Sequence, residues 1–161
     1  MRQFNKVAQA ILRTEWQELN RHQLKAKASW GYPGVYLLAY QPSTISKRPI
    51  DDLEQVFYVG MSRSIGGVSA RLGQFLRGIE LNVAHSGAKR FYRNHANNTA
   101  FSSLKKRKKF FVVVHTFKCT PNKASRTPKD LRIMGKVTCS EYYLLAAIKE
   151  VTGNEPELNQ Q

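Results

Sequence analysis

Two short apolar runs constrain the fold of this chain more than any other feature. They are "GVYLLAY" at residues 34–40 and "QVFYVGMS" at 55–62, and each has the length and the β-branched and aromatic content of a strand. The fourteen residues between them, "QPSTISKRPIDDLE", are polar and contain two prolines, as is usual for a surface loop. The pattern therefore predicts a long antiparallel hairpin.

Helical periodicity flanks this hairpin. Residues 4–27 predict one long amphipathic helix, which "WGYPG" at 30–34 ends. Further helices are expected over 68–80 and 138–151, and a shorter one begins near residue 85. A third strand is expected at "FFVVVHTF", residues 110–117, and the Pro-, Lys- and Thr-rich residues 118–137 predict a long excursion over the surface. The expected buried stripes are Val7, Ala8, Ile11, Leu12, Trp16 and Leu19, then Val68, Leu72, Phe75, Leu76 and Ile79, and finally Leu144, Leu145, Ile148 and Val151.

The expected fold class is α/β in the α+β sense, with a small three-stranded antiparallel sheet flanked by helices and an extra N-terminal helix. A chain of 161 residues with 42% apolar content suits one domain, 1–161, made of a helical extension over 1–30 and a core over 31–161. Cys119 and Cys139 are the only cysteines, and no segment resembles a signal peptide or a membrane span. We therefore expect a cytoplasmic protein with reduced thiols and no membrane partner.

The charge of the chain predicts a polyanionic partner. Lys and Arg number 26 against 11 Asp and Glu, a net charge of +15, and residues 81–129 hold twelve basic residues and no carboxylate. DNA is the expected partner, and structured RNA is not excluded. Anionic lipid is the weaker alternative, because the basic run at 105–109 leads into a strand instead of an amphipathic helix. The residues expected to bind nucleic acid are Lys89, Arg90, Arg93, Lys105, Lys106, Arg107, Lys108 and Lys109.

Glu141 is the carboxylate that most needs an explanation. Leu145 and Ile148 follow it by one and two helical turns, so it falls on the buried side of its helix, where a charge requires a partner. The residues alone also allow a structural interpretation. In "TCSE" at 138–141, Thr138 could cap the helix and Glu141 could bond back to its backbone amide.

Several of these features together resemble the GIY-YIG nuclease family. They are "GVY" at 34–36, "YVG" at 58–60, Arg71 on the following helix, Glu141 on a later helix and "LN" at 158–159. The resemblance spans residues 34–159. It implies two tyrosines on neighbouring strands of a small sheet, with an arginine and a glutamate supplied by flanking helices, and Asn159 supporting the site. Without it, Tyr36 and Tyr58 would be ordinary strand aromatics and Asn159 a frayed terminal residue.

The resemblance also implies a role for each of these residues in phosphodiester hydrolysis. Glu141 holds one divalent ion, Mg²⁺ or Mn²⁺, and a single carboxylate suffices because Mg²⁺ keeps most of its waters. Arg71 braces the scissile phosphate. Tyr36 is the general base and Tyr58 orients the water. Because a phenol has a pKa of about 10, only about one in a thousand is ionised at pH 7, so nearby cations are expected to lower that pKa.

Three features depart from the family pattern: the residue at position 75, the insertion "SRSIGG" before Arg71 and the long spacing from Glu141 to Asn159. One turn after the arginine, where many members have His or Tyr, this chain has Phe75, which we expect in the core. His85 and His95 are then the candidates for a second proton carrier. The glycines are expected to serve the site as well, Gly60 by letting the phosphate backbone approach the sheet and Gly34 by serving the turn after "YP".

Other catalytic schemes fit the sequence less well. His115, Cys119 and Cys139 lack a fourth ligand for zinc, "NHANN" at 94–98 lacks the context of a His-Asn-His nuclease, and no paired acids precede a Lys as in the two-carboxylate restriction fold. The expected function is a DNA endonuclease with one divalent ion, a stand-alone restriction-like or repair enzyme acting as a monomer or transient homodimer. The rival is a basic nucleic-acid-binding protein without catalysis, in which Glu141 is a cap and the tyrosines are core.

Overall fold

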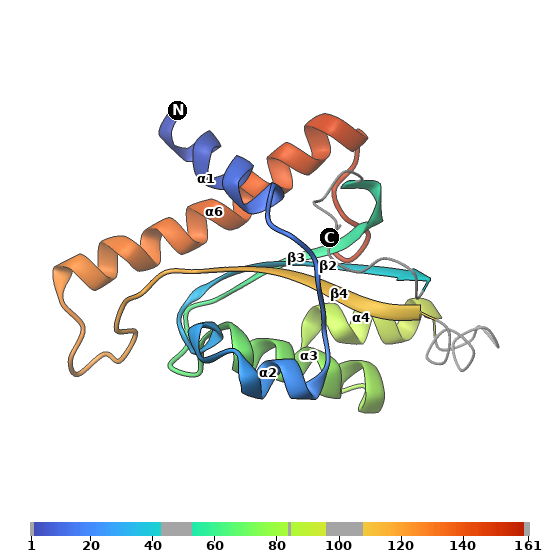
Figure 1. The fold of residues 1–161 in the computed structure, drawn as a ribbon, viewed down its shortest axis with the longest axis horizontal. Coiled ribbons are helices and arrows are strands. Elements are labelled where there is room, and N and C mark those ends of the chain that lie inside the picture. Colours follow the sequence, from blue (N-terminus) through green and yellow to red (C-terminus); the bar gives the residue numbers. More distant parts are fainter. Residues whose placement is uncertain (1, 43–52, 84, 96–107, 160–161) are drawn as a thin grey trace.

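The computed structural model describes residues 2–42, 53–83, 85–95 and 108–159 (Figure 1). Within these residues the fold is mixed α/β, as predicted, with one antiparallel sheet in the strand order β1-β4-β2-β3. The strands are β1 (Gln17–Glu18), β2 (Gly34–Pro42), β3 (Val56–Ser62) and β4 (Lys108–Thr116). The helices are α1 (Arg2–Leu12), α2 (Arg21–Ala26), α3 (Gly67–Leu81), α4 (Ser86–His95) and α6 (Pro128–Thr152), with 3-10 turns η1 (Ala28–Gly31) and η2 (Leu53–Gln55).

The predicted pairing of the two apolar runs is confirmed. β2 and β3 are antiparallel, with Gly34 opposite Ser62 and Leu38 opposite Tyr58, while residues 43–52 of their connection lie outside the described residues. The next pair joins Ala39 to Val56, so Phe57 is an extra residue and forms a bulge. Because of the bulge, Phe57 and Tyr58 both pack into the same core cluster although they are neighbours in sequence.

The N-terminal region differs from the expected long helix and contributes a fourth strand. α1 ends at Leu12, after which Gln17 and Glu18 pair with β4, and α2 starts anew with Asn20 accepting a hydrogen bond from Gln23 N at 2.9 Å. Trp16 and Leu19 are buried, one in each core cluster. Gln17 and Glu18 hydrogen-bond to backbone groups at the outer edge of β4, which a continued helix could not do. Residues 2–30 therefore contribute a strand to the sheet and side chains to both core clusters, and the predictions of three strands and of one long helix over 4–27 were wrong.

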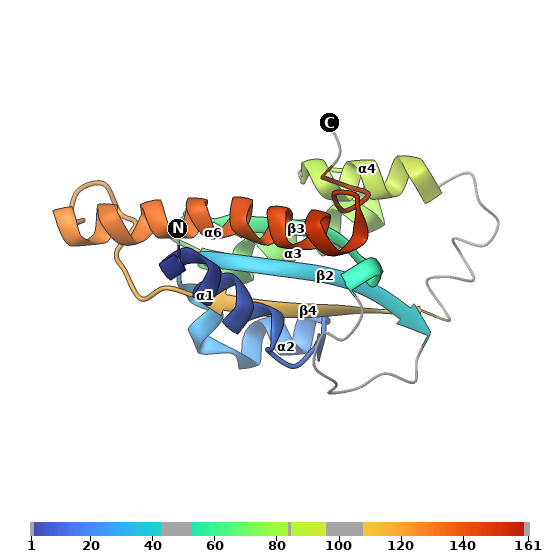
Figure 2. The ribbon, with the colours of Figure 1, turned by 90° about the horizontal axis from the view of Figure 1, so that it is seen from above.

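Helices cover both faces of the sheet. α1 and α6 lie on one face, and α2, α3 and α4 on the other (Figure 1). Side chains of β2 alternate between the two layers, with Val35 and Leu37 facing α1 and α6 and Tyr36 and Leu38 facing α3 and α4. The view from above places α6 along β3 (Figure 2). In the described part of the chain, no helix combines the length and the apolar character that crossing a bilayer demands.

The stripe predicted for α3 is confirmed, whereas that for α6 is confirmed only in part, because Leu145 is half-buried and Val151 is exposed. Val68, Leu72, Phe75, Leu76 and Ile79 of α3 are all buried, as are Leu144 and Ile148 of α6. Val151, in contrast, is 71% exposed because it lies in the last turn of the helix, beyond the sheet-covering stretch.

The start of α6 also corrects the sequence analysis. The helix begins at Pro128, ten residues before the expected start, and Thr127 and Asp130 form a reciprocal capping box. The proposed cap at Thr138 is wrong, because this residue lies inside the helix and its hydroxyl donates to Met134 O at 3.4 Å. The second half of the expected surface excursion, residues 128–137, is thus helical, and Glu141 has no role in capping.

Candidate functional site

The two tyrosines lie side by side on one face of the sheet. Tyr36 on β2 and Tyr58 on β3 have ring centroids 6.1 Å apart, and they are 0% and 6% exposed. Gly60 lies directly opposite Tyr36, and a Cβ at this glycine would be 2.6 Å from Tyr36 Cζ and Oη and 2.8 Å from Tyr58 Cε1. The glycine therefore makes room for the two rings, not for an approaching phosphate backbone as expected from the sequence.

His85 forms a buried hydrogen bond with the first of these tyrosines. Its Nε2 lies 3.0 Å from Tyr36 Oη, and its side chain is fully buried. The other ring nitrogen, Nδ1, accepts a hydrogen bond from Ala88 N at 3.3 Å. Since an accepting nitrogen carries no proton, the neutral imidazole has its proton on Nε2 and donates it to Tyr36 Oη. Burial, followed by the charges of Arg71 and Arg90, lowers the pKa of His85 to about 3, so this neutral form prevails at neutral pH.

Aromatic packing fixes the plane of the His85 ring. It stands edge-on to Tyr58 and Phe75, with centroids 5.6 and 5.4 Å away, and Phe75 is fully buried, as predicted. A Cβ at Gly87 would come within 2.9 Å of Tyr58 Cε2, so this glycine allows α4 to approach the tyrosines. Of the two histidines considered from sequence, His85 is thus brought to the site, whereas the side chain of His95 lies outside the described residues.

Arg71 reaches an open pocket at the end of β3. The pocket has a volume of about 370 Å³ and is lined by Met61, Ser62, Arg63, Ser64, Arg71 and Gln74. Gly67 fixes the direction in which α3 leaves this region, because its φ of +61° and its contact with the Gly31 backbone exclude a side chain. One turn later, Arg71 lies at the half-exposed edge of the helix and donates from Nη1 to Gln74 Oε1 at 3.1 Å.

Arg63 is a pocket residue that the sequence analysis missed. The turn carrying it is held by Ser62 and Ser64, whose hydroxyl oxygens are 3.0 Å apart, and by the bond from Gly67 N to Ser64 O at 3.0 Å. The residues "SRSIGG" were interpreted only as an insertion before Arg71. An arginine between two serines, directly after a glycine-containing strand that ends at the site, is the signal that could have identified it.

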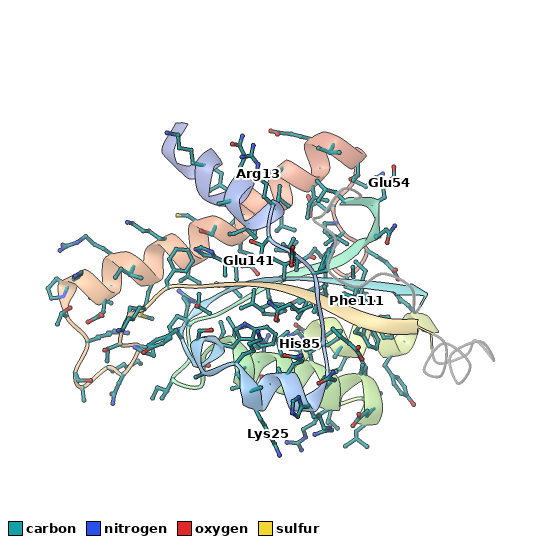
Figure 3. The ribbon with its side chains drawn as sticks, in the orientation of Figure 1. Arg13, Lys25, Glu54, His85, Phe111 and Glu141 are labelled. Atoms are coloured by element: carbon teal, nitrogen blue, oxygen red, sulfur yellow. The ribbon has the colours of Figure 1, made fainter. Side chains whose placement is uncertain are left out.

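Glu141 lies on the opposite face of the sheet from His85 (Figure 3). It is half-buried on the same stripe of α6 as Val137 and Leu144, and among the described residues its carboxylate has no hydrogen bond or ion pair. Burial raises its pKa, while the charges of Arg63 and Arg71 lower it. Arg71 also acts on both tyrosines, so its charge links groups that lie on the two faces of the sheet.

Both phenols have raised pKa values. Burial raises the pKa of Tyr36 well above its usual value, and Tyr58 adds to this; Arg71 lowers it through its charge and through a hydrogen bond, and Glu141 raises it. Burial also dominates at Tyr58, where Arg71 again lowers the pKa and Glu141 raises it. Arg71 thus lowers both pKa values, as expected, but in the absence of a metal ion burial outweighs its effect. At neutral pH both side chains are un-ionised phenols.

Asn159 is anchored to the edge strand and is not a frayed terminal residue. Its Oδ1 accepts from Val59 N and its Nδ2 donates to Val59 O, both at 2.8 Å. The preceding Leu158 is fully buried, and its amide donates to Phe57 O at 2.9 Å. These bonds occupy backbone groups of β3 on either side of Tyr58, so Asn159 supports the strand that carries this tyrosine.

Of the basic residues expected to bind nucleic acid, those whose side chains the structure describes do not line the pocket. Lys89 and Arg93 are exposed and Arg90 is half-buried on α4. The backbones of Lys108 and Lys109 start β4 opposite Pro42 and Gln41, whereas the pocket adjoins the other end of the sheet, where Thr116 pairs with Gly34 and Gly34 with Ser62. Eight residues of strand separate these ends by about 26 Å. Lys105, Lys106, Arg107 and the side chains of Lys108 and Lys109 lie outside the described residues.

Gly34 also has a different role from the one expected. A Cβ at this residue would lie 2.3 Å from His115 O and 2.9 Å from Thr116 Cα, so the glycine is needed for the close approach of β4 and not for a turn.

The described residues contain no group of three or more His, Cys, Asp or Glu side chains that could hold a metal ion, and both Cys119 and Cys139 are free. A divalent ion here would rest on Glu141 with oxygens from water and substrate, as Mg²⁺ allows.

Comparisons with protein-family models, curated proteins and solved structures found no match. Function is therefore inferred from the side chains themselves.

Replacing His85 should change how stability depends on pH. The pKa of about 3 in the folded protein lies below the ordinary value of about 6.5, so the unfolded chain binds the extra proton between these values and stability falls as pH decreases. Relative to His85→Gln, the wild type should lose up to about 1.4 kcal/mol per pH unit in this window. Urea denaturation at pH 7, 5.5 and 4.5 measures this difference, and parallel curves would show that His85 binds its proton equally well in the folded and the unfolded chain, contrary to the prediction.

Removing the Asn159 side chain should destabilise the edge strand. Asn159→Ala deletes two backbone contacts at Val59, so we expect a loss of about 1–3 kcal/mol in the free energy of unfolding. Asn154→Ala, at an exposed residue of the same C-terminal segment, serves as the control and should stay within about 0.5 kcal/mol of wild type. Equal stabilities of the two variants in urea would contradict the anchoring role.

Proposed function

We propose that this chain is a DNA endonuclease that hydrolyses phosphodiester bonds with one divalent metal ion, in the manner of the GIY-YIG nucleases. The observation that carries the proposal is the position of Arg71, which lines an open pocket while its charge acts on Tyr36, Tyr58 and Glu141. Four residues of three types that phosphodiester hydrolysis can use, contributed by four separate elements, thereby share one electrostatic environment.

The pocket has the chemistry of a phosphate site. Arg63 and Arg71 contribute two guanidinium groups, and Ser62 and Ser64 contribute hydroxyls from the adjoining turn. A guanidinium presents a planar set of donors that matches two phosphate oxygens at once. Negative charge that develops on the phosphoryl oxygens during hydrolysis would be offset by donors already held in place.

Glu141 is the residue that would hold the metal ion. An ionised carboxylate at a half-buried position without a hydrogen-bonding partner among the described residues is stabilised by a cation. When bound, a divalent ion offsets charge on the phosphoryl oxygens and lowers the pKa of a coordinated water. The charges of Arg63 and Arg71 oppose the effect of burial on the pKa of Glu141 and so favour the ionised form that a metal ligand must have.

The Tyr36 and His85 pair would supply and orient a phenolic oxygen. His85 donates to Tyr36 Oη, so the phenol proton points elsewhere. Acting as a general base requires the phenolate, which burial disfavours and which Arg71 and further positive charge at the site favour. The His85 N–H then stabilises the negative oxygen as it forms, and Tyr58 is the neighbour that orients the attacking water.

A binding protein without catalysis is the second candidate function. The burial of both phenols favours it, because neither ring is among the residues that line the pocket. In that case Arg63 and Arg71 bind a phosphate group without hydrolysing it. The two functions differ in whether a divalent ion converts bound DNA to product.

Nicking of supercoiled plasmid should separate these functions. With Mg²⁺ or Mn²⁺ the wild type should nick the plasmid, and Glu141→Gln should lower the rate by about 100-fold or more, because it removes the anionic ligand. Glu150→Gln, at an exposed residue of the same helix, is the matched control and should retain the wild-type rate. Binding by all three proteins without nicking, across a range of divalent ions, would support the binding protein instead.

The stability of Glu141→Gln provides a measurement that does not depend on activity. Because burial raises the pKa of Glu141, the folded protein binds a proton more readily than the unfolded chain, and wild-type stability falls as pH rises through this raised pKa. At pH 7 the variant should therefore be more stable than wild type, by up to about 1 kcal/mol. Added Mg²⁺ or Mn²⁺ should raise the melting temperature of wild type only. A rise of equal size in the variant would place the ion elsewhere.

A further inference from the structure

A second concentration of positive charge lies close to the pocket, in residues 118–136, here called the basic arm. It contains six basic residues and a single carboxylate, that of Asp130. All of the basic residues are exposed except Arg126, which is half-buried. They are Lys118, Lys123, Arg126, Lys129, Arg132 and Lys136.

Hydrogen bonds hold the loop of the arm against its helix. Asp130 accepts from Thr120 N at 2.9 Å and from Thr127 N at 2.7 Å, so one carboxylate joins both parts of the loop to the first turn of α6. Asn122 O accepts from Arg126 N at 2.9 Å and closes the turn between them. The arm is therefore a defined surface, and the Asp130 carboxylate is engaged in holding it together.

The helical part of the arm extends away from the core. The loop and the first turns of α6 project past the end of the sheet in both views (Figures 1 and 2). The buried residues of α6 begin at Val137, so the turns before it have no buried side chain. Lys129, Arg132 and Lys136 are spaced i, i+3 and i+7 and so share one face of the helix. A solvent-exposed row of three cations results.

The arm starts at the end of the sheet that carries the pocket. Thr116 pairs with Gly34, which pairs with Ser62 of the pocket lining, and Phe117 N donates to Pro33 O at 2.7 Å just before the arm begins. Along the axis of α6, Lys136 and Lys129 lie about 7.5 and 18 Å from Glu141. These distances correspond to roughly two and five base pairs of B-DNA.

We propose that the basic arm binds the phosphate backbone of a DNA duplex, about two to five base pairs from the bond in the pocket. The inference rests on the proposed function for the position of that bond, but the binding surface itself does not require catalysis. A duplex fits the arm because a row of cations along a rigid helix matches a row of phosphates. An anionic membrane fits less well, since an interfacial helix needs a broad apolar face and the apolar face of α6 covers the sheet.

The test compares two double variants that each remove two positive charges. Arg132→Gln with Lys136→Gln alters the arm, and Lys25→Gln with Arg77→Gln alters exposed residues of α2 and α3, across the sheet from α6. Glutamine is a good helix former, so both should fold. Binding of a fluorescent 20-base-pair duplex in EDTA, followed by anisotropy over a range of salt concentrations, gives the Kd and the salt slope of each.

The arm variant should bind about tenfold more weakly, and its slope of log K against log salt should be shallower by about 2, while the control keeps both near wild type. Wild-type affinity and slope in the arm variant, or equal weakening in the control, would overturn the inference. So would equal competition by anionic vesicles or single-stranded RNA at matched phosphate concentration. Binding is measured in EDTA, where no metal-dependent cleavage occurs, so the two proposals can fail separately. If the arm variant binds more weakly but the wild type does not nick plasmid in Mg²⁺, the binding role of the arm is supported and only the nuclease proposal is refuted.

Discussion

The buried hydrogen bond between Tyr36 Oη and His85 Nε2 is the contact on which the rest of the site depends. Both groups are fully buried, so each would lose several kcal/mol of solvation without the other. The bond joins the central strand β2 to the start of α4, and the edges of Tyr58 and Phe75 enclose the His85 ring. Gly60 and Gly87 are required because side chains there would overlap these rings. One polar pair therefore determines the identity of several neighbours that contact no solvent.

The candidate site is assembled from both faces of the sheet around the end of one edge strand. The phenols belong to the layer of α3 and α4, whereas Glu141 belongs to the layer of α1 and α6. Arg71 connects them, because its charge acts on all three. Two features here oppose stability, a half-buried carboxylate without a hydrogen-bonding partner among the described residues and the helical turns of the basic arm, which have no fully buried side chain. Natural proteins tolerate such features chiefly where they serve function.

The sequence was informative where side-chain periodicity decides structure and uninformative where tertiary pairing does. The hairpin of β2 and β3 and the stripe of α3 were predicted because alternation and helical spacing are local properties. The fourth strand was missed because Gln17 and Glu18 are a strand only by pairing with β4. The start of α6 was missed because Pro128 was taken for a loop residue, although proline suits the first turn of a helix. His85 could be named only as an alternative, since its contact with Tyr36 spans 49 residues of chain.

The fold also separates basic residues that lie close together in the sequence, so composition alone could not locate the binding surface. Composition placed the basic residues between 81 and 129 in one group, yet the β4 ladder separates them, with Lys108 and Lys109 at one end of the strand and the basic arm after the other. Only the second end adjoins Arg63, Arg71 and Glu141. Coulombic attraction between exposed charges is screened beyond about 8 Å at physiological salt. Because the two ends of β4 lie about 26 Å apart, only cations beside the second end can fix which phosphate faces Arg71.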